Sequence, residues 1–377
     1  MTTYDTIIIG AGGMGAACAR HLARRGLRVL VLEQFTLAHD RGSSHGRARV
    51  IRKAYFEDPR YVPMLHRAYA LWRELEAESD EQLLFFCGVL NMGPAEHACI
   101  QGVRQCAIEH ALPHEIVDAG EIRRRWPTFA PEDADVGVFE TDGGFHLPER
   151  AIELHARFAA QQGADFRWST KVRSWSATAN DVRVRTDTDE FVAKNLVVTA
   201  GAWLGELESE IGALLQVERQ VQLWWKPKDP SLCRHDRMPA FIHFTGDQAY
   251  YGIPAMADEG LKLGRHHGGE ISTPDAVDRS LRPEDEADVR AYIRRHAPNA
   301  DGPLLDHAVC MYTNTPDDHF ILDRHPRHRN VIIAGGFSGH GFKFAPLVGE
   351  VVADLLTTGE SRTPVGLFSA TRFRQGC

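Results

Sequence analysis

A glycine-rich turn between two apolar runs near the start of the chain most constrains the fold. Residues 4–10 (YDTIIIG) form a continuous apolar run ending in glycine, which is typical of a parallel strand covered on both faces. GAGGMG follows at once, residues 16–26 (AACARHLARRG) predict an amphipathic helix, and residues 27–33 (LRVLVLE) predict a second strand. This order predicts a dinucleotide-binding α/β unit.

Three glycines of the turn fit the pattern G-x-G-x-x-G, and each has a physical purpose. Gly10 makes the tight turn, Gly12 lets the backbone approach a pyrophosphate, and Gly15 allows close packing of helix against strand. Glu33, at the end of the second strand, would accept hydrogen bonds from the ribose hydroxyls of an adenosine. The fingerprint alone does not separate NAD from FAD.

Three later segments are predicted to add strands and helices to the same sheet. They are a helix pattern at 150–163, a strand running into a small-residue turn at 191–203, and a strand, glycine-rich turn and helix at 329–359. A nicotinamide enzyme usually completes its cofactor domain in one contiguous block, whereas an FAD domain often collects pieces from the whole chain. The discontinuity therefore favours FAD.

The remaining segments show a different pattern of apolar residues. Residues 81–144 and 215–310 contain alternating apolar patterns and one clear helix, at 283–296. We expect an α/β fold, α+β overall, in which a Rossmann-like FAD-binding domain is joined to a substrate domain with a mixed, largely antiparallel sheet. The expected ranges are 1–80, 145–214 and 315–377 for the FAD-binding domain, and 81–144 and 215–314 for the substrate domain.

Composition narrows the choice of partner and compartment. A formal net charge of -8 disfavours nucleic acid, which is bound mainly by clustered Lys and Arg. No apolar stretch approaches the ~20 residues that a membrane helix needs, and the N-terminus shows no secretory signal. The cysteines are scattered and the histidine pairs lack ligands at familiar metal spacings, so we expect a cytoplasmic protein with free thiols and no metal.

Four further stretches, together with the fingerprint, resemble the monomeric sarcosine oxidase family, which includes N-methyltryptophan oxidase and peroxisomal sarcosine/pipecolate oxidase. They are RGSSHGRARVIRKAY (41–55), YYGIPAMADEGLKLGRHH (250–267), CMYTNTPDDHFILD (310–323) and GFSGHGFKFAP (336–346). The resemblance covers essentially the whole chain and implies a monomeric flavoprotein that oxidises the C–N bond of a secondary amino acid, such as sarcosine, an N-methyl amino acid or pipecolate. The electrons would pass to O2, which becomes H2O2.

The resemblance also implies roles for basic residues. It places His45 and Arg49 beside the flavin and assigns the substrate carboxylate to Arg52 and Lys343, which would combine a bidentate fork with a compact charge. Without the family, the stretch at 41–55 also fits a solvated basic loop, and Lys343 fits a surface lysine on an amphipathic helix.

By resemblance, Tyr251 and His266 line the substrate pocket near the reacting nitrogen, where a lowered amine pKa would favour hydride transfer. Lys262 would stabilise the negative charge that develops on O2. The alternatives are aromatic packing for Tyr250 or Tyr251, which face opposite ways on a strand, and a half-exposed strand lysine for Lys262.

Cys310 has the most specific implied role. In the family, the cysteine before the Met-Tyr-Thr stretch forms a thioether with the flavin 8-methyl group, and an inert buried thiol is the alternative. The resemblance implies further cofactor contacts, of which the last three would direct backbone N–H groups at the flavin pyrimidine. These contacts are Ser43, Val172, Gly201, Gly339, His340 and Gly341.

The chain also departs from the family. Arg47 and Ala48 stand where an acidic residue and a threonine are frequent, and Arg265 stands where an aromatic residue is common. These changes leave the substrate side chain open. A dehydrogenase that uses another electron acceptor and a non-catalytic flavin-binding subunit stay as alternative functions.

Overall fold

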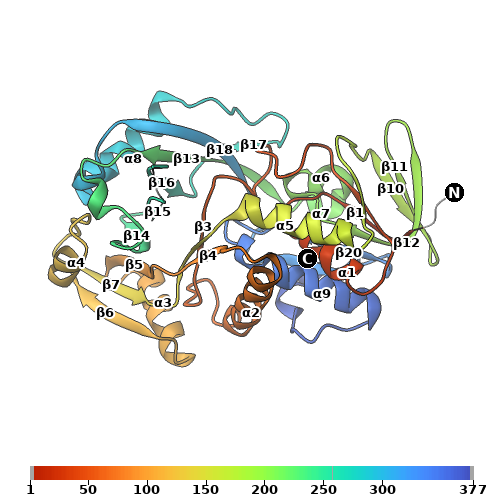
Figure 1. Ribbon diagram of the computed structural model, residues 1–377, viewed down its shortest axis with the longest axis horizontal. Coiled ribbons are helices and arrows are strands. Elements are labelled where there is room, and N and C mark those ends of the chain that lie inside the picture. The colour runs from red at the N-terminus through yellow and green to blue at the C-terminus, as the bar shows by residue number, and fades with distance from the viewer. Residues whose placement is uncertain (1–3, 257, 374–377) are drawn as a thin grey trace.

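The structure, a computed structural model, describes residues 4–256 and 258–373, which form two lobes (Figure 1). The lobe at the right of Figure 1 contains an eight-stranded sheet of order β10-β11-β12-β1-β2-β9, with β20 beside β12 and β19 beside β20. Its strands are β1 (Tyr4–Ile9), β2 (Val29–Leu32), β9 (Asp165–Arg167), β10 (Ser174–Ala177), β11 (Val182–Arg185), β12 (Glu190–Val198), β19 (Ile321–Arg324) and β20 (Val331–Gly335).

The centre of this sheet is parallel and comes from separate parts of the chain. Strand β1 pairs in parallel with β2 and β12, and β12 pairs in parallel with β20. Parallel pairing needs crossover connections, which here are long enough to contain helices and much of the second lobe. The predicted discontinuous Rossmann-like sheet is therefore confirmed.

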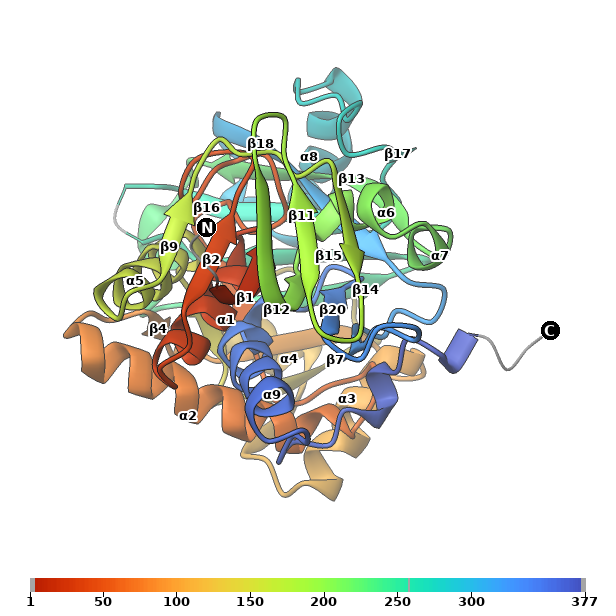
Figure 2. The same cartoon turned by 90° about the vertical axis from the view of Figure 1, so that its right-hand side faces the viewer.

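Helices pack beside this sheet. Helices α1 (Gly13–Ala23), α5 (Pro148–Gln161) and α9 (Ala345–Thr357) pack together, and α2 (Tyr61–Ser79) lies against α9 (Figure 2). The predicted first helix ends at Ala23, three residues before Gly26, whose φ of 78° is a left-handed conformation that favours glycine. This turn leads the chain directly into β2.

The lobe at the left of Figure 1 contains a nine-stranded sheet of order β17-β13-β16-β15-β14-β5-β7-β6, with β18 beside β13. Its pairings are antiparallel apart from that of β5 with β14, so the predicted mixed, largely antiparallel sheet is confirmed. The strands are β5 (Val89–Pro94), β6 (His114–Asp118), β7 (Asp135–Glu140), β13 (Gln216–Trp225), β14 (Ala240–Thr245), β15 (Gln248–Ile253), β16 (Leu261–His266), β17 (Ile271–Ser272) and β18 (Leu304–Asn314).

Three helices accompany this second sheet. Helix α8 (Pro283–His296) has the predicted bounds and buries Val289, Tyr292 and Ile293 in the core. Helices α3 (Ala98–Glu109) and α4 (Ala119–Arg125) were not predicted. The short α4 buries two residues, too few to show a helical period. Helix α3 buries Ile100, Val103 and Ala107 at helical spacing, so its pattern was present in the sequence but not recognised.

A small third sheet of β3 (Arg49–Ile51), β8 (Gly144–His146) and β4 (Leu84–Phe85) completes the strands. Strand β4 lies in the range expected for the substrate domain yet pairs with β8, and the domain boundaries stay a prediction. The short helical turns are η1 (Gly201–Trp203), α6 (Leu204–Leu207), α7 (Ser209–Gly212), η2 (Pro230–Leu232), η3 (Pro298–Ala300), η4 (Phe342–Phe344) and η5 (Gly366–Phe368).

Residues 4–256 and 258–373 contain neither a membrane-spanning helix nor a metal-ligand cluster. None of their helices is both long and apolar enough to cross a membrane. No group of three or more His, Cys, Asp or Glu side chains among them could hold a metal ion. The described cysteines are free thiols.

Candidate active site

One large cavity extends from the glycine turn after β1 to the face of the second sheet. It encloses about 1990 Å³, part of it open to solvent. Its lining joins the turn after β1 to side chains of the second sheet, so the cavity connects the expected dinucleotide site with the expected substrate site. The predicted site residues that line it are Gly10, Gly12, Glu33, Ser43, Arg49, Arg52, Val172, Gly201, Tyr251, His266, Cys310, Gly339, His340, Gly341 and Lys343.

The turn after β1 needs its glycines for steric reasons. Gly10 has a φ of 93°, and a Cβ on Gly15 would lie 1.8 Å from the carbonyl oxygen of Gly10. Thr199 Oγ1 lies 2.9 Å from the carbonyl oxygens of both Ile9 and Gly10, which ties β12 to the same turn. Gly15 itself does not line the cavity, because it is packed against the turn.

Weakly satisfied donors at this end of the cavity fit an anionic dinucleotide. Helix α1 begins without a capping side chain, and its Gly13 N–H makes only a long contact, 3.4 Å, with Ser44 Oγ, so this helix start can serve a ligand. In the described part of the chain, the N–H groups of Gly339 and Gly341 meet no acceptor. Thr313 Oγ1, also buried beside the cavity, has no partner there either.

Glu33 lies where an adenosine ribose would be expected. Its carboxylate accepts from the Ala11 N–H at 2.7 Å and from the Phe35 N–H at 2.9 Å. Burial by itself opposes ionisation, but His39 and the Ala11 N–H lower the pKa of Glu33 below its usual value. The side chain is therefore an anion at neutral pH.

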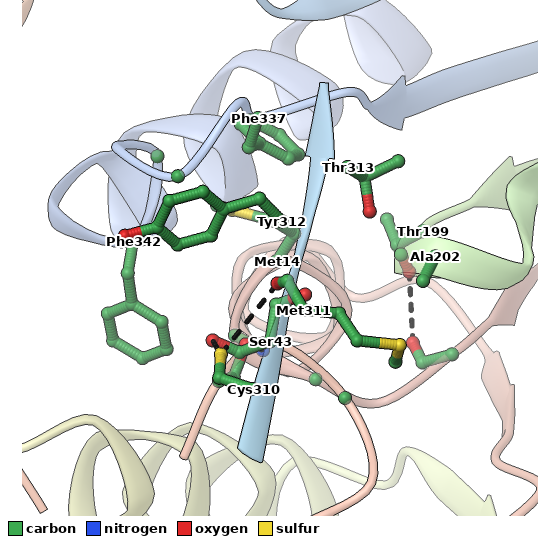
Figure 3. Close-up of a pocket in the computed structure, with 18 of the residues that line it drawn as sticks. Met14, Ser43, Thr199, Ala202, Cys310, Met311, Tyr312, Thr313, Phe337 and Phe342 are labelled. Carbon is green, nitrogen blue, oxygen red and sulfur yellow. Dashed lines mark hydrogen bonds between the residues drawn. The ribbon is translucent and has the colours of Figure 1, made fainter. Parts of the chain in front are cut away.

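The cavity-facing side chains of the second sheet follow from its register. Tyr251 on β15 shares a face with Lys262 and His266 on β16, because side chains alternate along a strand and directly paired residues lie on one side. Through β13 this face continues to Cys310 and Tyr312 on β18. Figure 3 shows Cys310 and Tyr312 together on one side of β18.

The register also separates two adjacent tyrosines. Tyr250 stacks on Tyr292 with ring centroids 4.2 Å apart in the core, whereas Tyr251 lines the cavity. Burial raises the pKa of Tyr251 to about 12. His266 Nδ1 lies 3.1 Å from the Tyr312 hydroxyl, and burial lowers the pKa of His266 well below its ordinary value. Tyr251 and His266 are thus both neutral at neutral pH.

Cys310 is buried and its thiol lines the cavity. The Arg49 guanidinium donates to Cys310 Sγ at 3.5 Å, and Sγ lies 3.6 Å from the Ser43 carbonyl oxygen. Arg49 also donates to the Ser43 carbonyl at 3.1 Å and to Gln222 Oε1 at 3.0 Å. The loop after β2 is thereby held against β18 and β13 at the predicted attachment point.

Lys262 and His45 are buried but do not line the cavity. Lys262 Nζ donates to the carbonyl oxygens of Gly46 and Ala48, each at 2.8 Å. An ammonium has three N–H groups, and the third has no acceptor in the described chain. Burial and the neighbouring Arg49 lower the pKa of Lys262 well below its usual value, and burial lowers the pKa of His45 to about 3.

Two cations and one anion meet at the substrate end of the cavity. Arg52 donates to both carboxylate oxygens of Glu57, at 2.6 and 2.9 Å, and to the Ala54 carbonyl at 2.6 Å. Lys343, on η4 just before α9, donates to the His340 carbonyl at 2.6 Å. Burial, and then Arg52, lower the pKa of Lys343 to about 7. Arg52 therefore already binds a carboxylate of the chain itself.

A smaller cavity adjoins the first one at this end. It encloses about 940 Å³, partly open to solvent, and shares Glu57, His266 and His340 with the large cavity. Asp247 and Asp318 lie on its wall. The two cavities therefore meet beside Glu57, the partner of Arg52.

Sequence reasoning missed several site residues. Glu57 was visible five residues after Arg52, in the same basic stretch, so an acidic neighbour could have signalled the ion pair. Thr199 followed a predicted strand at its turn, which is a typical place for a ligand-side residue. Gln222 carried no local signal, because it meets Arg49 through strand register alone.

The family of FAD dependent oxidoreductases matches residues 5–355. Monomeric sarcosine oxidase of Streptomyces avermitilis is 40% identical to this chain over 375 residues, which cover 98% of each protein. N-methyl-L-tryptophan oxidase of Salmonella dublin is 37% identical over 376 residues, which cover 99% of this chain and 100% of the relative.

Solved structures share the fold. The open form of NikD, described as an unusual amino acid oxidase essential for nikkomycin biosynthesis, superposes with a TM-score of 0.87 at 23% identity and covers 98% of both chains. L-proline dehydrogenase from P. horikoshii superposes with a TM-score of 0.85 at 24% identity, covering 99% of this chain and 98% of the other. With the fingerprint turn and its cavity, these matches over nearly the whole length show that the chain belongs to the family of FAD dependent oxidoreductases.

Proposed function

We propose that the protein oxidises the C–N bond of a secondary amino acid, such as sarcosine, another N-methyl amino acid or pipecolate, and that O2 accepts the electrons and becomes H2O2. The observation that carries the proposal is that buried Arg52 and Lys343 meet neutral Tyr251 and His266 in the cavity that the glycine turn also lines. Relatives named for sarcosine and N-methyltryptophan oxidation support this substrate class.

Arg52 and Lys343 bind the substrate carboxylate in this proposal. An incoming carboxylate competes with Glu57 for the Arg52 guanidinium, whose planar fork suits two parallel hydrogen bonds. Lys343, on η4, adds a compact charge from a segment that is distant from Arg52 in the sequence. When Lys343 is protonated, two cations face one carboxylate, and the excess positive charge attracts an anion.

Burial acts on the substrate nitrogen. Desolvation in the cavity disfavours an ammonium, so the pKa of the bound amine falls and its lone pair becomes available. Bound FAD supplies the two-electron acceptor. The pKa of Tyr251 is raised to about 12 and that of His266 is lowered, so both act by polarity and orientation rather than by exchanging a proton.

Lys262 serves the oxygen half of the reaction. Reduction of O2 builds negative charge on oxygen, and a fixed cation in a site of low dielectric stabilises that charge. Replacing Lys262 by Met should slow reoxidation of the reduced flavin far more than its reduction by substrate. Equal effects on the two steps would remove this assignment.

The cofactor-holding residues in this proposal line the cavity: the glycine turn, Glu33, Ser43 and Arg49, and the 339–341 turn, with Val172 and Gly201 at the adenosine end. His45 lies buried behind them. We propose that Cys310 forms a thioether with the FAD 8-methyl carbon. The S–H bond and one C–H bond of the methyl group break, one C–S bond forms, and O2 takes the two protons and two electrons released and becomes H2O2. After acid denaturation the yellow colour should stay with the polypeptide, and Cys310→Ala should release it. Colour released by the unaltered protein would contradict the thioether.

The substrate class is tested by anaerobic mixing with sarcosine, N-methyl amino acids of increasing size and pipecolate. Bleaching of the flavin absorbance, followed by H2O2 formation when O2 is admitted, is expected. No bleaching with any member would support the non-catalytic alternative, and bleaching that O2 reverses only slowly would support the dehydrogenase alternative.

We also propose that the protein acts as a monomer in the cytoplasm. The name of its relative, monomeric sarcosine oxidase, supports the monomer. Light scattering after size exclusion should give a mass near 42.1 kDa at micromolar concentration. A dimer mass would contradict this assignment.

A further inference from the structure

Glu149, near the start of α5, contacts the loop that holds Lys262. Its Oε1 accepts from the N–H of Gly46 at 2.5 Å and from the N–H of Arg47 at 3.0 Å. Gly46 has a φ of 107° and Arg47 a φ of 65°, so two consecutive residues adopt left-handed conformations. Such a conformation in a non-glycine residue costs free energy and persists where surrounding contacts hold it.

One peptide group connects Glu149 to Lys262. The Arg47 N–H that donates to Glu149 and the Gly46 carbonyl that accepts from Lys262 Nζ, at 2.8 Å, belong to the same peptide unit. A carboxylate at the N–H end polarises that unit and strengthens the hydrogen bond accepted at the carbonyl end. The three groups thus form one hydrogen-bonded chain ending at the Lys262 ammonium.

Glu149 also balances the local charge. Arg49 and Arg47 both disfavour the protonated form of Lys262, and burial disfavours it most. The Glu149 carboxylate opposes them and raises the pKa of Lys262 and of Arg49. Arg47 has its own partner in Asp306, and His45 beside it is neutral because burial lowers its pKa to about 3.

We propose that Glu149 is a positioning residue for the reduction of O2: it holds the Gly46–Arg47 peptide so that the Gly46 carbonyl fixes the Lys262 ammonium, and its charge balances that ammonium. Glu149 does not line the cavity and touches neither substrate nor O2. The inference rests on the proposed role of Lys262.

The decisive experiment compares Glu149→Gln, which keeps an oxygen acceptor but removes the charge, with Glu149→Asp, which keeps the charge. The control is Glu153→Gln, one turn along α5, where the carboxylate pairs with Arg150 on the surface. Each holoenzyme is reduced with dithionite and mixed with O2 over a range of pH. No amino acid is needed, so failure of the proposed substrate class does not affect this test.

Reoxidation requires protonated Lys262 and should fall as the pH rises past its pKa. Glu149→Gln lowers that pKa, so the fall should begin at lower pH, and on the alkaline limb the rate should be roughly tenfold lower for each pH unit by which the pKa of Lys262 falls. Glu149→Asp and Glu153→Gln should keep the original pH profile. A profile unchanged in Glu149→Gln would overturn the proposal, whereas a Lys262→Met variant with unaltered reoxidation would instead refute the role of Lys262.

Hydrogen exchange supplies a readout that does not depend on turnover. The amides of Gly46 and Arg47 should exchange slowly in the unaltered protein and in Glu149→Gln. In Glu149→Ala they should exchange at least tenfold faster, because the free energy of opening the loop falls by ~1.4 kcal/mol or more. Protection of strand β1 shows that each variant is folded. Equal protection of both amides in Glu149→Ala would exclude the anchoring role.

Discussion

The two ends of the cavity are built in opposite ways. At the dinucleotide end, a single stretch of some thirty residues supplies the turn. The backbone there leaves no space for a Cβ atom, as at Gly10 and Gly15. At the substrate end, Arg52, Tyr251 and Lys343 come from three distant segments, and the requirement is for charged or polar side chains that burial penalises. The first end depends on local sterics and the second on tertiary packing that offsets desolvation.

This contrast predicts different losses. Changes at the dinucleotide end should remove the cofactor and destabilise the fold, because they displace backbone in the first sheet. Changes at the substrate end should leave FAD bound and alter kinetics.

Gly15→Val should abolish FAD binding. The new Cβ would lie 1.8 Å from the Gly10 carbonyl oxygen and 2.7 Å from Thr199 Oγ1, so α1 must move away from β1. The ratio of flavin to protein absorbance in purified protein measures the loss. Gly366→Ala is the control, because nothing lies within 4 Å of its added Cβ. Normal flavin content in Gly15→Val would show that FAD binding does not depend on the absence of a side chain at this turn.

Arg52→Met should lower kcat/KM by ~10²- to 10³-fold, because truncating one partner of a buried charge pair between protein and ligand costs about 2–5 kcal/mol of binding. FAD content should stay unchanged. Lys53→Met is the control, since Lys53 pairs with Asp142 and does not line the cavity. Steady-state kinetics with the best substrate of the panel measures the effect. A loss of flavin in this variant would show that the substrate end of the cavity also controls FAD binding.

Binding of a carboxylate analogue should depend on pH through Lys343. With its pKa lowered to about 7, Lys343 is charged below that pH and neutral above it, so the Kd of cyclohexanecarboxylate should rise above pH 7 by up to ~10-fold. The rise should level off where Arg52 alone holds the anion. Flavin absorbance titrations measure Kd. Lys343→Met should bind weakly at all pH values, and a persisting pH dependence in that variant would reassign the titrating group.

The adjacent tyrosines give the smallest and sharpest contrast. Tyr251→Phe should lower kcat/KM a few-fold without changing Tm, because it removes a hydroxyl of the cavity wall. Tyr250→Phe loses hydrogen bonds to Gln248 at 2.6 Å and Asp288 at 3.0 Å, which should cost ~1 kcal/mol and about 2 °C in Tm without affecting kinetics. Kinetic effects of equal size would show that the register does not separate their roles.

Much of the architecture was predictable because it repeats local rules. The apolar run of β1, the glycine turn, α1 and β2 are contiguous, and α8 begins with Pro283 and acidic residues that favour a helix N-terminus. Helices α2 and α3 were not predicted although their buried apolar residues follow a helical period. Helix α4 buries only two residues and depends on its contacts with β6 and β7, which a local pattern does not contain.

The site was predictable only where a stretch could be matched to a family. Residues such as Cys310 and Lys343 stood in recognisable stretches, and their roles stay proposals. Among their partners, Glu57, which binds Arg52, had a local signal five residues away. Gln222, which binds Arg49, and Glu149, which binds the peptide that Lys262 contacts, had none. These contacts join residues far apart in the chain or depend on side-chain direction in a loop.

By itself, the sequence determined that the chain builds a dinucleotide-binding α/β unit, because sterics at adjacent glycines and the period of apolar residues act over a few residues at a time. Only the tertiary structure decided which of two neighbouring tyrosines faces the cavity, which carboxylate occupies Arg52 and what holds Lys262 in place. The physical reason is that strand register and burial arise when distant segments pack, and they set both the direction of a side chain and the pKa of its charge.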